Sequence, residues 1–423
     1  MSYVRGLTPG TFDTVAFRAI KGHEEYVQHP FELSEYHSRL NRVREQMRKM
    51  NIDLLYITTP EAICYLHGYY TSWYKANSPM RYPQLYGTAV HVDHDRCIHF
   101  DNPTEASQLL MTSVSTDNRF FSSREGRPTL EFIMNELRRE GWLKGTVGLE
   151  FWSYVPNRAV SMMMERAFRD NGCEVVDGST IMREVRRVKS PQEIKYIEEA
   201  VGIADIGHRT IIEKLKPGMT ELELFGEVVS AMMAAGGEFP ALIPIFSTAP
   251  VVNGVPLAGG HSMATRKRIR DGEVLCADLC GVVNRYHGNV LRGFYVGGNP
   301  PARMVDQYKR ASGVYEVIRK KTKAGMTVAE VNQTVRKYYE DVGLWEQDGW
   351  ALGYELGLSL PPDWVGEFYF NLRDTDYLDR VFDEGMVTNF ESMFNTTLID
   401  TIVWEKNGAR TLSKMPEELI VIG

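Results

Sequence analysis

Short apolar runs alternate with helical periodicity in the first half of the chain. Residues 53–59, Asp-Leu-Leu-Tyr-Ile-Thr-Thr, form an apolar run between turn residues, which predicts a β-strand. Further short strands and helices are predicted in turn along this half: strands at 88–100, 146–150 and 173–177, and helices at 34–50, 129–140 and 157–171. Strands that alternate with helices indicate an α/β domain, in which the helices cover a sheet.

The pattern changes near residue 183. Residues 183–189 are basic and polar, and residues 192–214 then keep helical periodicity over a long stretch. We therefore predict an N-terminal domain at 1–183 and a C-terminal domain at 184–423. A chain of 423 residues exceeds the size at which a single hydrophobic core stops growing, which also favours two domains.

The second half contains a weak internal repeat. Lys216-Pro-Gly-Met-Thr-Glu-Leu-Glu recurs as Lys323-Ala-Gly-Met-Thr-Val-Ala-Glu, and in both copies Thr is followed three residues later by Glu, the signature of a capping box. A glycine then opens an apolar run and precedes an acid by six residues, Asp278 in one copy and Glu391 in the other. Such units predict a pseudo-symmetric domain that brings both acids to one central site. Chance similarity of short turn-and-strand sequences is the alternative.

Charge and cysteine content narrow the classes of partner. The net charge of -7 argues against a nucleic-acid surface or a polybasic membrane patch, because either needs clustered positive charge. The five cysteines are scattered and odd in number, which suits reduced thiols. No window has the roughly 20 uncharged apolar residues of a membrane span, and the N-terminus lacks a signal-peptide pattern. We expect a cytoplasmic protein whose partner is a small-molecule substrate.

Several of these motifs resemble a known superfamily. Ser190-Pro-Gln-Glu-Ile-Lys-Tyr-Ile-Glu-Glu-Ala, the Lys-Pro-Gly-Met-Thr turn and Gly385-Met-Val-Thr-Asn-Phe-Glu are similar to the creatinase/prolidase/methionine-aminopeptidase group. The resemblance covers essentially the whole chain. It implies an α/β N-terminal domain, an α+β "pita-bread" C-terminal domain with a pseudo-two-fold internal repeat, and a homodimer.

The resemblance also implies where metal ligands would lie. Metallopeptidases of this group bind two metal ions through two Asp, one His and two Glu. Those positions fall here on Asp278, Asn289, Tyr354, Glu391 and Ile399. Only two of the five ligand types survive, so we expect no metal and no other cofactor. An alignment shifted by one residue would instead bring in Glu355 and Asp400, which could restore a single metal.

The metal-free creatinase branch supplies a candidate histidine. Gly260-His-Ser-Met-Ala-Thr-Arg resembles the creatinase segment that carries its catalytic histidine, so the resemblance makes His261 the general acid/base. Glu391 likewise matches a creatinase glutamate that contacts a guanidinium group. A loop histidine bonded to a backbone carbonyl is the structural alternative for His261.

The remaining candidate groups need partners of their own. Asp278 and Glu391 lie in apolar strands, where an unpaired carboxylate is costly, so each should meet a cationic substrate, a protonated His261, or a structural Arg or Lys. Tyr354 could donate a hydrogen bond to a developing anion, act as a base if its pKa were lowered, or pack in the core.

An aromatic segment, residues 69–86, is the most distinctive feature of the first half. Trp73, Tyr74 and Tyr82 would suit a quaternary or guanidinium cation, and Arg81 would suit a carboxylate. An aromatic dimer interface is the alternative. In creatinase-like enzymes the corresponding region lines the active site of the neighbouring subunit, so the resemblance allows both roles together.

These observations predict a metal-independent hydrolase of a non-peptide C–N bond, of the amidine or amide type, in a small zwitterionic compound, similar to creatinase or the ectoine hydrolases. Three alternatives stay open. The first is a lyase of a small cationic carboxylate resembling the dimethylsulfoniopropionate lyases, the second a metal-dependent Xaa-Pro peptidase, and the third a catalytically inactive binding protein.

Overall fold

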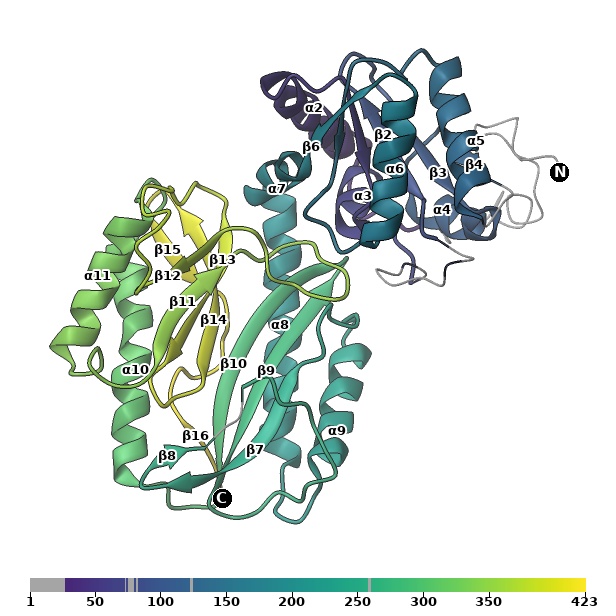
Figure 1. The fold of residues 1–423 in the computed structure, drawn as a ribbon. Coiled ribbons are helices and arrows are strands. Elements are labelled where there is room, and N and C mark those ends of the chain that lie inside the picture. The colour runs from purple at the N-terminus through teal and green to yellow at the C-terminus, as the bar shows by residue number, and fades with distance from the viewer. Residues whose placement is uncertain (1–26, 73, 75–79, 81–82, 122–124, 258–259) are drawn as a thin grey trace. The chain divides into compact units, whose positions relative to one another are not determined.

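Two compact units, Met1–Arg186 and Arg187–Gly423, make up the chain in this computed structural model (Figure 1). The structure describes residues 27–72, 74, 80, 83–121, 125–257 and 260–423. Within the described part of the chain, none of the helices combines the length and apolarity that a membrane span requires.

The first unit is a six-stranded mixed sheet with helices on it. The strand order is β4-β3-β2-β1-β5-β6, with bounds β1 Leu54–Ile57, β2 Gly87–His91, β3 Cys97–Asp101, β4 Asn118–Phe120, β5 Thr146–Leu149 and β6 Glu174–Asp177. The helices of this unit are α2 Leu33–Lys49, α3 Pro60–His67, α4 Ala106–Thr112, α5 Gly126–Arg139, α6 Arg158–Asp170 and α7 Ser179–Arg187, with a 3-10 turn at Pro103–Glu105. The α/β architecture predicted from the apolar runs is confirmed.

One predicted strand in this unit is wrong. Residues 88–100 were expected to form a single strand, but they form the antiparallel pair β2 and β3, joined by a turn after His91. The polar sequence Asp93-His-Asp-Arg interrupts the apolar run at this turn. Polar turn residues between two apolar stretches are the signal of a hairpin, which overrides the reading as one strand.

The second unit is built around a ten-stranded sheet whose two halves repeat. The main strand order is β12-β11-β13-β14-β10-β9-β7-β8, with β15 added to β14 and β16 added to β10. The bounds are β7 Ile245–Val252, β8 Val255–Pro256, β9 Glu273–Val283, β10 Tyr286–Val296, β11 Trp350–Tyr354, β12 Tyr369–Asn371, β13 Val387–Met393, β14 Leu398–Glu405, β15 Gly408–Thr411 and β16 Ile420–Ile422. β10 and β14 pair at Leu291 and Ile399, where the two halves of the sheet join.

Each half of this sheet carries a helix pair. The helices are α8 Pro191–Lys214 and α9 Glu221–Ala234 in the first half, and α10 Ala302–Lys321 and α11 Val328–Asp341 in the second. α8 packs on β9 and β10, and α10 packs on β13 and β15 (Figure 1). Thr220 and Thr327 form the two predicted capping boxes, so the repeat read from the sequence is confirmed as a structural pseudo-symmetry.

Close packing of α8 fixes which face of β9 and β10 is left for a site. A Cβ at Gly281 would lie 1.8 Å from the carbonyl oxygen of Ala200, so only glycine allows the helix to approach this closely. Because side chains alternate along a strand, Asp278 and Asn289 then project from the opposite face, away from α8.

Candidate active site

Strand register places the two candidate acids in one row across the sheet. Asp278 on β9 lies opposite Leu291 on β10, Leu291 lies opposite Ile399 on β14, and Ile399 lies opposite Glu391 on β13. Neighbouring strands are about 4.8 Å apart, so two aliphatic positions separate the carboxylates in this row. The repeat therefore brings both acids to one central region, as the glycine offset predicted.

Two asparagine amides link these carboxylates. Asn289 donates through Nδ2 to Asp278 Oδ1 at 2.6 Å and accepts through Oδ1 from Asn389 Nδ2 at 3.2 Å. The same Nδ2 of Asn389 lies 3.4 Å from Glu391 Oε1, while its Oδ1 accepts from the backbone N–H of Tyr354 at 2.8 Å. The result is a continuous amide bridge from one carboxylate to the other across the pseudo-two-fold axis.

A cavity of about 440 Å³ lies over this row and contains all four predicted catalytic residues, His261, Asp278, Tyr354 and Glu391. This volume suits a small organic ligand. Its apolar floor is made by Cys276, Leu291 and Ile399 with Ile245 and Met393. Four carboxylates line it, Asp278, Asp348, Asp363 and Glu391, whereas the described lining contains no Lys or Arg.

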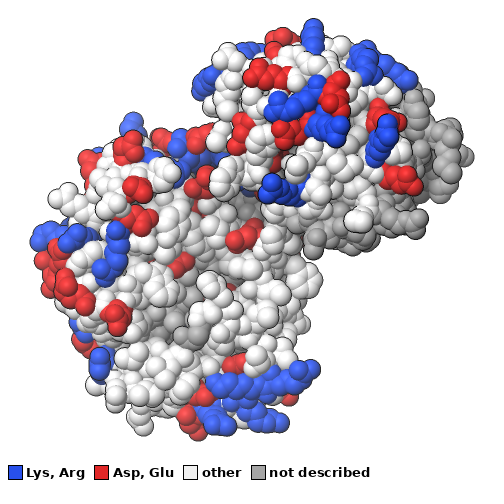
Figure 2. Space-filling model, viewed as in Figure 1, with Lys and Arg blue, Asp and Glu red and all other residues white. Residues whose placement is uncertain are grey.

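The surface over the same strands agrees with this charge pattern. Figure 2 shows isolated acidic surface and no Lys or Arg in the centre of the second unit in this view, whereas cations gather at its edges. A pocket lined by carboxylates without a cation favours a positively charged ligand group.

Burial raises the proton affinity of both carboxyl groups. The pKa of Asp278 is raised to about 7, because loss of water outweighs the hydrogen bond from Asn289 and the nearby Glu391 adds to the rise. Burial also raises the pKa of Glu391, against the opposing effects of hydrogen bonds from Trp350 and Asn389 and of nearby His261. Near neutral pH Asp278 therefore changes between acid and carboxylate.

Neither acid belongs to a structural ion pair with Arg or Lys among the described residues. Glu391 instead accepts a hydrogen bond from Trp350 Nε1 at 3.1 Å and the longer one from Asn389, and Asp278 accepts one from Asn289. The sequence-based alternative of a structural Arg or Lys partner is therefore wrong for this part of the chain.

Tyr354 is built as a hydrogen-bond donor. Its phenol oxygen accepts from Trp364 Nε1 at 3.2 Å. Burial and the nearby charges of Asp278 and Glu391 hold its pKa well above the usual value, so the alternative of a tyrosine base with a lowered pKa is contradicted. The protonated phenol lines the cavity and can donate to negative charge that develops there.

His261 lies at the exposed side of the cavity lining. Its backbone adopts a left-handed conformation, with φ of 53°, which is uncommon for a residue with a side chain. The side chain is close enough to Glu391 to favour the ionised carboxylate. An exposed imidazole beside a carboxylate has access to both solvent and ligand.

The two neighbouring acids that could have restored a metal do not reach the cavity. Glu355, next to Tyr354, accepts a 2.5 Å hydrogen bond from the buried Lys189 Nζ. Asp400, next to Ile399, pairs with the buried Arg292 at 2.8 Å. Neither acid lines the cavity, because strand alternation turns each away from its cavity-lining neighbour.

The donor set does not fit the two-metal centre of metallopeptidases. Among the positions that the resemblance assigns to ligands, Asn289 offers a carboxamide already used in the amide bridge, Tyr354 a protonated phenol, and Ile399 no donor atom. No group of three or more His, Cys, Asp or Glu side chains within the described residues is arranged to hold a metal ion. Hard divalent cations need several oxygen or imidazole donors.

Three of the four predicted ligand-contacting residues, Trp73, Arg81 and Tyr82, lie outside the described residues. Tyr74 is described and half-buried, in the first unit. Its phenol lies near those of Tyr86 and Tyr154. The role of this aromatic segment stays a prediction.

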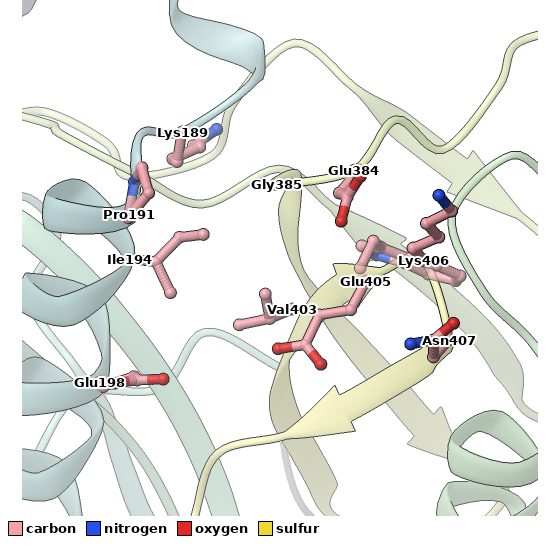
Figure 3. Close-up of a pocket in the computed structure, with 11 residues that line it drawn as sticks. Lys189, Pro191, Ile194, Glu198, Glu384, Gly385, Val403, Glu405, Lys406 and Asn407 are labelled. Carbon is pink, nitrogen blue, oxygen red and sulfur yellow. The ribbon is translucent and has the colours of Figure 1, made fainter.

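A larger cavity of about 610 Å³ lies elsewhere in the second unit, between the start of α8 and the β14–β15 turn (Figure 3). Three of the five charged side chains that line it already have ion-pair partners. Glu198 and Glu405 both bind Arg410, at 2.7 and 3.0 Å, and Lys189 binds Glu355. Size alone therefore does not identify the site, and convergent chemistry favours the smaller cavity.

The sequence did not single out Asn389, Trp350 or Trp364. Asn389 precedes Glu391 by two residues in a predicted strand, so period-two alternation could have identified it as a neighbour on the same face. The two tryptophans come from the start of β11 and from a loop, and no local pattern indicated that their indoles would meet Glu391 and Tyr354.

Comparison with known proteins gives a consistent family assignment. The pattern of metallopeptidase family M24 matches residues 195–411, and that of the creatinase/prolidase N-terminal domain matches residues 39–188. The ectoine hydrolase of Halomonas elongata is 26% identical over 416 residues, which cover 93% of this chain and 98% of that protein. The Xaa-Pro dipeptidase of Pyrococcus furiosus is 25% identical over 394 residues, 90% of this chain and 99% of that protein.

Solved structures show the same fold. An Xaa-Pro dipeptidase from Bacillus anthracis superposes with a TM-score of 0.73 at 20% identity, covering 91% of this chain and 99% of that one. A dipeptidase from Pyrococcus horikoshii gives a TM-score of 0.73 at 20% identity, covering 90% of this chain and 99% of that one. The predicted α/β plus pita-bread architecture is therefore confirmed, and the names of the relatives support an enzyme of the hydrolase or peptidase kind.

Proposed function

The chain belongs to metallopeptidase family M24, and we propose that it is a metal-independent hydrolase of a non-peptide C–N bond, of the amidine or amide type, in a small zwitterionic compound. The observation that carries this proposal is the row Asp278, Leu291, Ile399, Glu391. Two aliphatic side chains lie between the acids. The amide bridge gives each carboxylate a hydrogen-bond donor in place of a metal ion. The likeness to an ectoine hydrolase over most of both chains supports a non-peptide substrate.

Charge decides how the substrate would lie. The cationic group would face Asp278 and Glu391 over the apolar floor, because the described cavity lining has carboxylates and lacks Lys and Arg. The carboxylate end of a zwitterion needs a cation that this lining does not offer. Arg81, outside the described residues, keeps that role in the proposal. Trp73, Tyr74 and Tyr82 keep their predicted role beside the cationic group, and a homodimer would let the whole segment come from a second copy.

Each titratable group then has a role in the reaction. A water oxygen bonds to the carbon of the C–N group, His261 takes a proton from that water, and Tyr354 donates to the atom on which negative charge develops. The C–N bond breaks, and the proton passes from His261 to the leaving nitrogen. Asp278 and Glu391 orient the cationic substrate and the water.

The experiment is a product analysis in ¹⁸O-labelled water with guanidino, ureido and cyclic amidine compounds, after treatment of the protein with a chelator. Hydrolysis places one ¹⁸O atom in the product and releases a new amine. A lyase would give an unsaturated product without ¹⁸O, and a peptidase would act on Xaa-Pro dipeptides instead. Absence of turnover on the whole set, with tight binding of a partner, would favour the inactive binding protein. Each of these three results would contradict the proposal.

A further inference from the structure

Two tryptophan side chains contact the two groups that would touch the substrate. Trp350 Nε1 donates to Glu391 Oε2 at 3.1 Å, and Trp364 Nε1 donates to the Tyr354 phenol oxygen at 3.2 Å. Both indoles also line the cavity. They differ in exposure, because Trp350 is 46% exposed at the first residue of β11, whereas Trp364 is 2% exposed.

The chemistry of indole fixes the direction of both hydrogen bonds. An indole N–H is a donor and cannot accept, so the phenol oxygen of Tyr354 must be the acceptor in its bond with Trp364. Among the described residues this is the one hydrogen bond of that oxygen, and the phenol proton is therefore left to point into the cavity. By the same argument Trp350 holds Glu391 Oε2 as an acceptor and leaves Oε1, with its weaker contact to Asn389, for a ligand.

The surroundings of Trp364 make its position rigid. Asp363 Oδ1 accepts from the backbone N–H groups of Trp364 and Val365, at 2.7 and 3.2 Å. The same loop is tied to Glu355, the residue after Tyr354, because the Gly366 N–H donates to the Glu355 carbonyl. A Cβ at Gly366 would lie 2.8 Å from Glu355, so the loop can approach β11 this closely only with glycine.

A buried ion pair holds Glu355, the residue to which the loop is tied. Lys189 Nζ binds Glu355 Oε1 at 2.5 Å and the Arg187 carbonyl at 3.0 Å. Glu355 Oε2 also lies 3.4 Å from the Phe368 N–H, at the end of the loop. Glu355 therefore fixes both partners of the Tyr354–Trp364 contact. It follows Tyr354 in the chain, and it is hydrogen-bonded to the loop that carries Trp364.

From this geometry we infer that Trp350 and Trp364 are paired positioning residues for the proposed reaction: Trp350 orients the Glu391 carboxylate toward the cationic group, and Trp364 forces Tyr354 to act as the hydrogen-bond donor. The inference rests on the proposed function for its catalytic meaning. Its structural content, two donor-only indoles that each fix one ligand-contacting oxygen, holds for any ligand with a cation and an acceptor.

The test is a pair of double-mutant cycles. The first combines Trp350→Phe with Glu391→Gln, and the second combines Trp364→Phe with Tyr354→Phe. Phenylalanine keeps an aromatic ring and removes the N–H. Trp404→Phe is the matched control, because the buried Trp404 indole donates to Thr388 Oγ1 at 3.0 Å and does not line this cavity.

The primary readout is the dissociation constant for glycinamide, which joins an ammonium group to an amide carbonyl, so that the cycles do not depend on turnover. Each Trp→Phe change should weaken binding about threefold to tenfold, the usual effect of one hydrogen bond. Each double variant should bind no more weakly than Glu391→Gln or Tyr354→Phe alone, since the indole acts through that partner. The control should bind like the wild type.

Once a substrate is known, the same variants give a second readout. Trp350→Phe should raise KM with kcat nearly unchanged, because the carboxylate binds the cation equally in the ground state and the transition state. Trp364→Phe should raise KM and also lower kcat, because the Tyr354 hydrogen bond strengthens as negative charge develops. Additive effects within either pair, or a control as impaired as the two variants, would overturn the inference. A protein that turns over no C–N compound yet shows both couplings in glycinamide binding would instead disprove the proposed function and keep the positioning roles.

Discussion

The two halves of the second unit share a scaffold and differ in chemistry. Both halves start a helix at a Thr-Glu capping box and place an acid six residues after a glycine, Asp278 on β9 and Glu391 on β13. The partners of the acids differ, because Asp278 has one amide donor, whereas Glu391 has an amide, an indole and a nearby imidazole. The repeat thus gives the two acids equivalent positions in the sheet, while their different partners give each carboxylate its own hydrogen-bonding surroundings.

The largest expected effect comes from removing the negative charge of either acid in the row. Glu391→Gln and Asp278→Asn should each lower kcat/KM by about a thousandfold, the range for removal of a positioned acid, base or electrostatic group. Steady-state kinetics on the substrate from the ¹⁸O analysis measures this effect. If both variants were as active as the wild type, the charges of the two acids would not be needed. The hydrogen-bonded amide bridge would then account for the role of the row.

Carboxylates at two positions of the site, one in the row and one beside it, should alter its ion preference. The double variant Asn289→Asp with Ile399→Glu turns two of the non-ligand positions back into carboxylates. We expect it to bind a divalent transition metal, seen as a metal-dependent rise of Tm that the wild type lacks. A wild-type protein stabilised by the same metal to the same extent would contradict our reading of the donor set.

Acids on the opposite face should affect stability rather than activity. Asp400→Asn leaves the fully buried Arg292 without its charge partner, and should lower the free energy of unfolding by about 3 to 5 kcal/mol. Denaturant titration measures the loss. Asp278→Asn is the control, since its carboxylate has no ion pair in the described structure. A stability loss of the same size in the control would contradict the distinction between acids that stabilise the fold and acids that line the cavity.

The last expected effect is a pH dependence of stability that comes from Asp278. Its pKa rises from 3.8 to about 7 on folding, so the native state holds the proton more tightly. The resulting stabilisation is fully present below pH 4 and is lost as the pH rises from about 4 to about 7. The difference in unfolding free energy between wild type and Asp278→Asn should follow this slope and level off above pH 7. A flat difference over this range would show that Asp278 is ionised throughout.

The sequence predicted the frame of the site better than its contacts. The repeat and the period-two alternation were sufficient to bring Asp278 and Glu391 together, because both follow from local strand geometry. Trp364 could not be predicted in the same way, since its indole reaches Tyr354 only through a loop tied to Glu355 by backbone hydrogen bonds. The prediction of one strand over residues 88–100 is wrong because the four polar residues 93–96 form a turn between two paired strands.

The residues at the metal-ligand positions also show what the sequence predicts and what only the structure reveals. Ile399 and Asn289 could be read from the sequence as substitutions at ligand positions. The structure adds that Asn289 is already bonded on both sides, to Asp278 and Asn389, and that Glu355 and Asp400 are held by Lys189 and Arg292. Which acid faces the cavity depends on strand register and on these partners, and a single sequence leaves both open.

The central claim is that this member of a metallopeptidase family cleaves a non-peptide C–N bond without a metal. The most direct test measures metal content and turnover on the same sample, before and after chelation, with cyclic amidine compounds and Xaa-Pro dipeptides side by side. We predict amidine hydrolysis at an unchanged rate after chelation, with far less than one metal ion per chain and no dipeptide cleavage. Dipeptide cleavage that is lost on chelation and restored by added metal would contradict the claim.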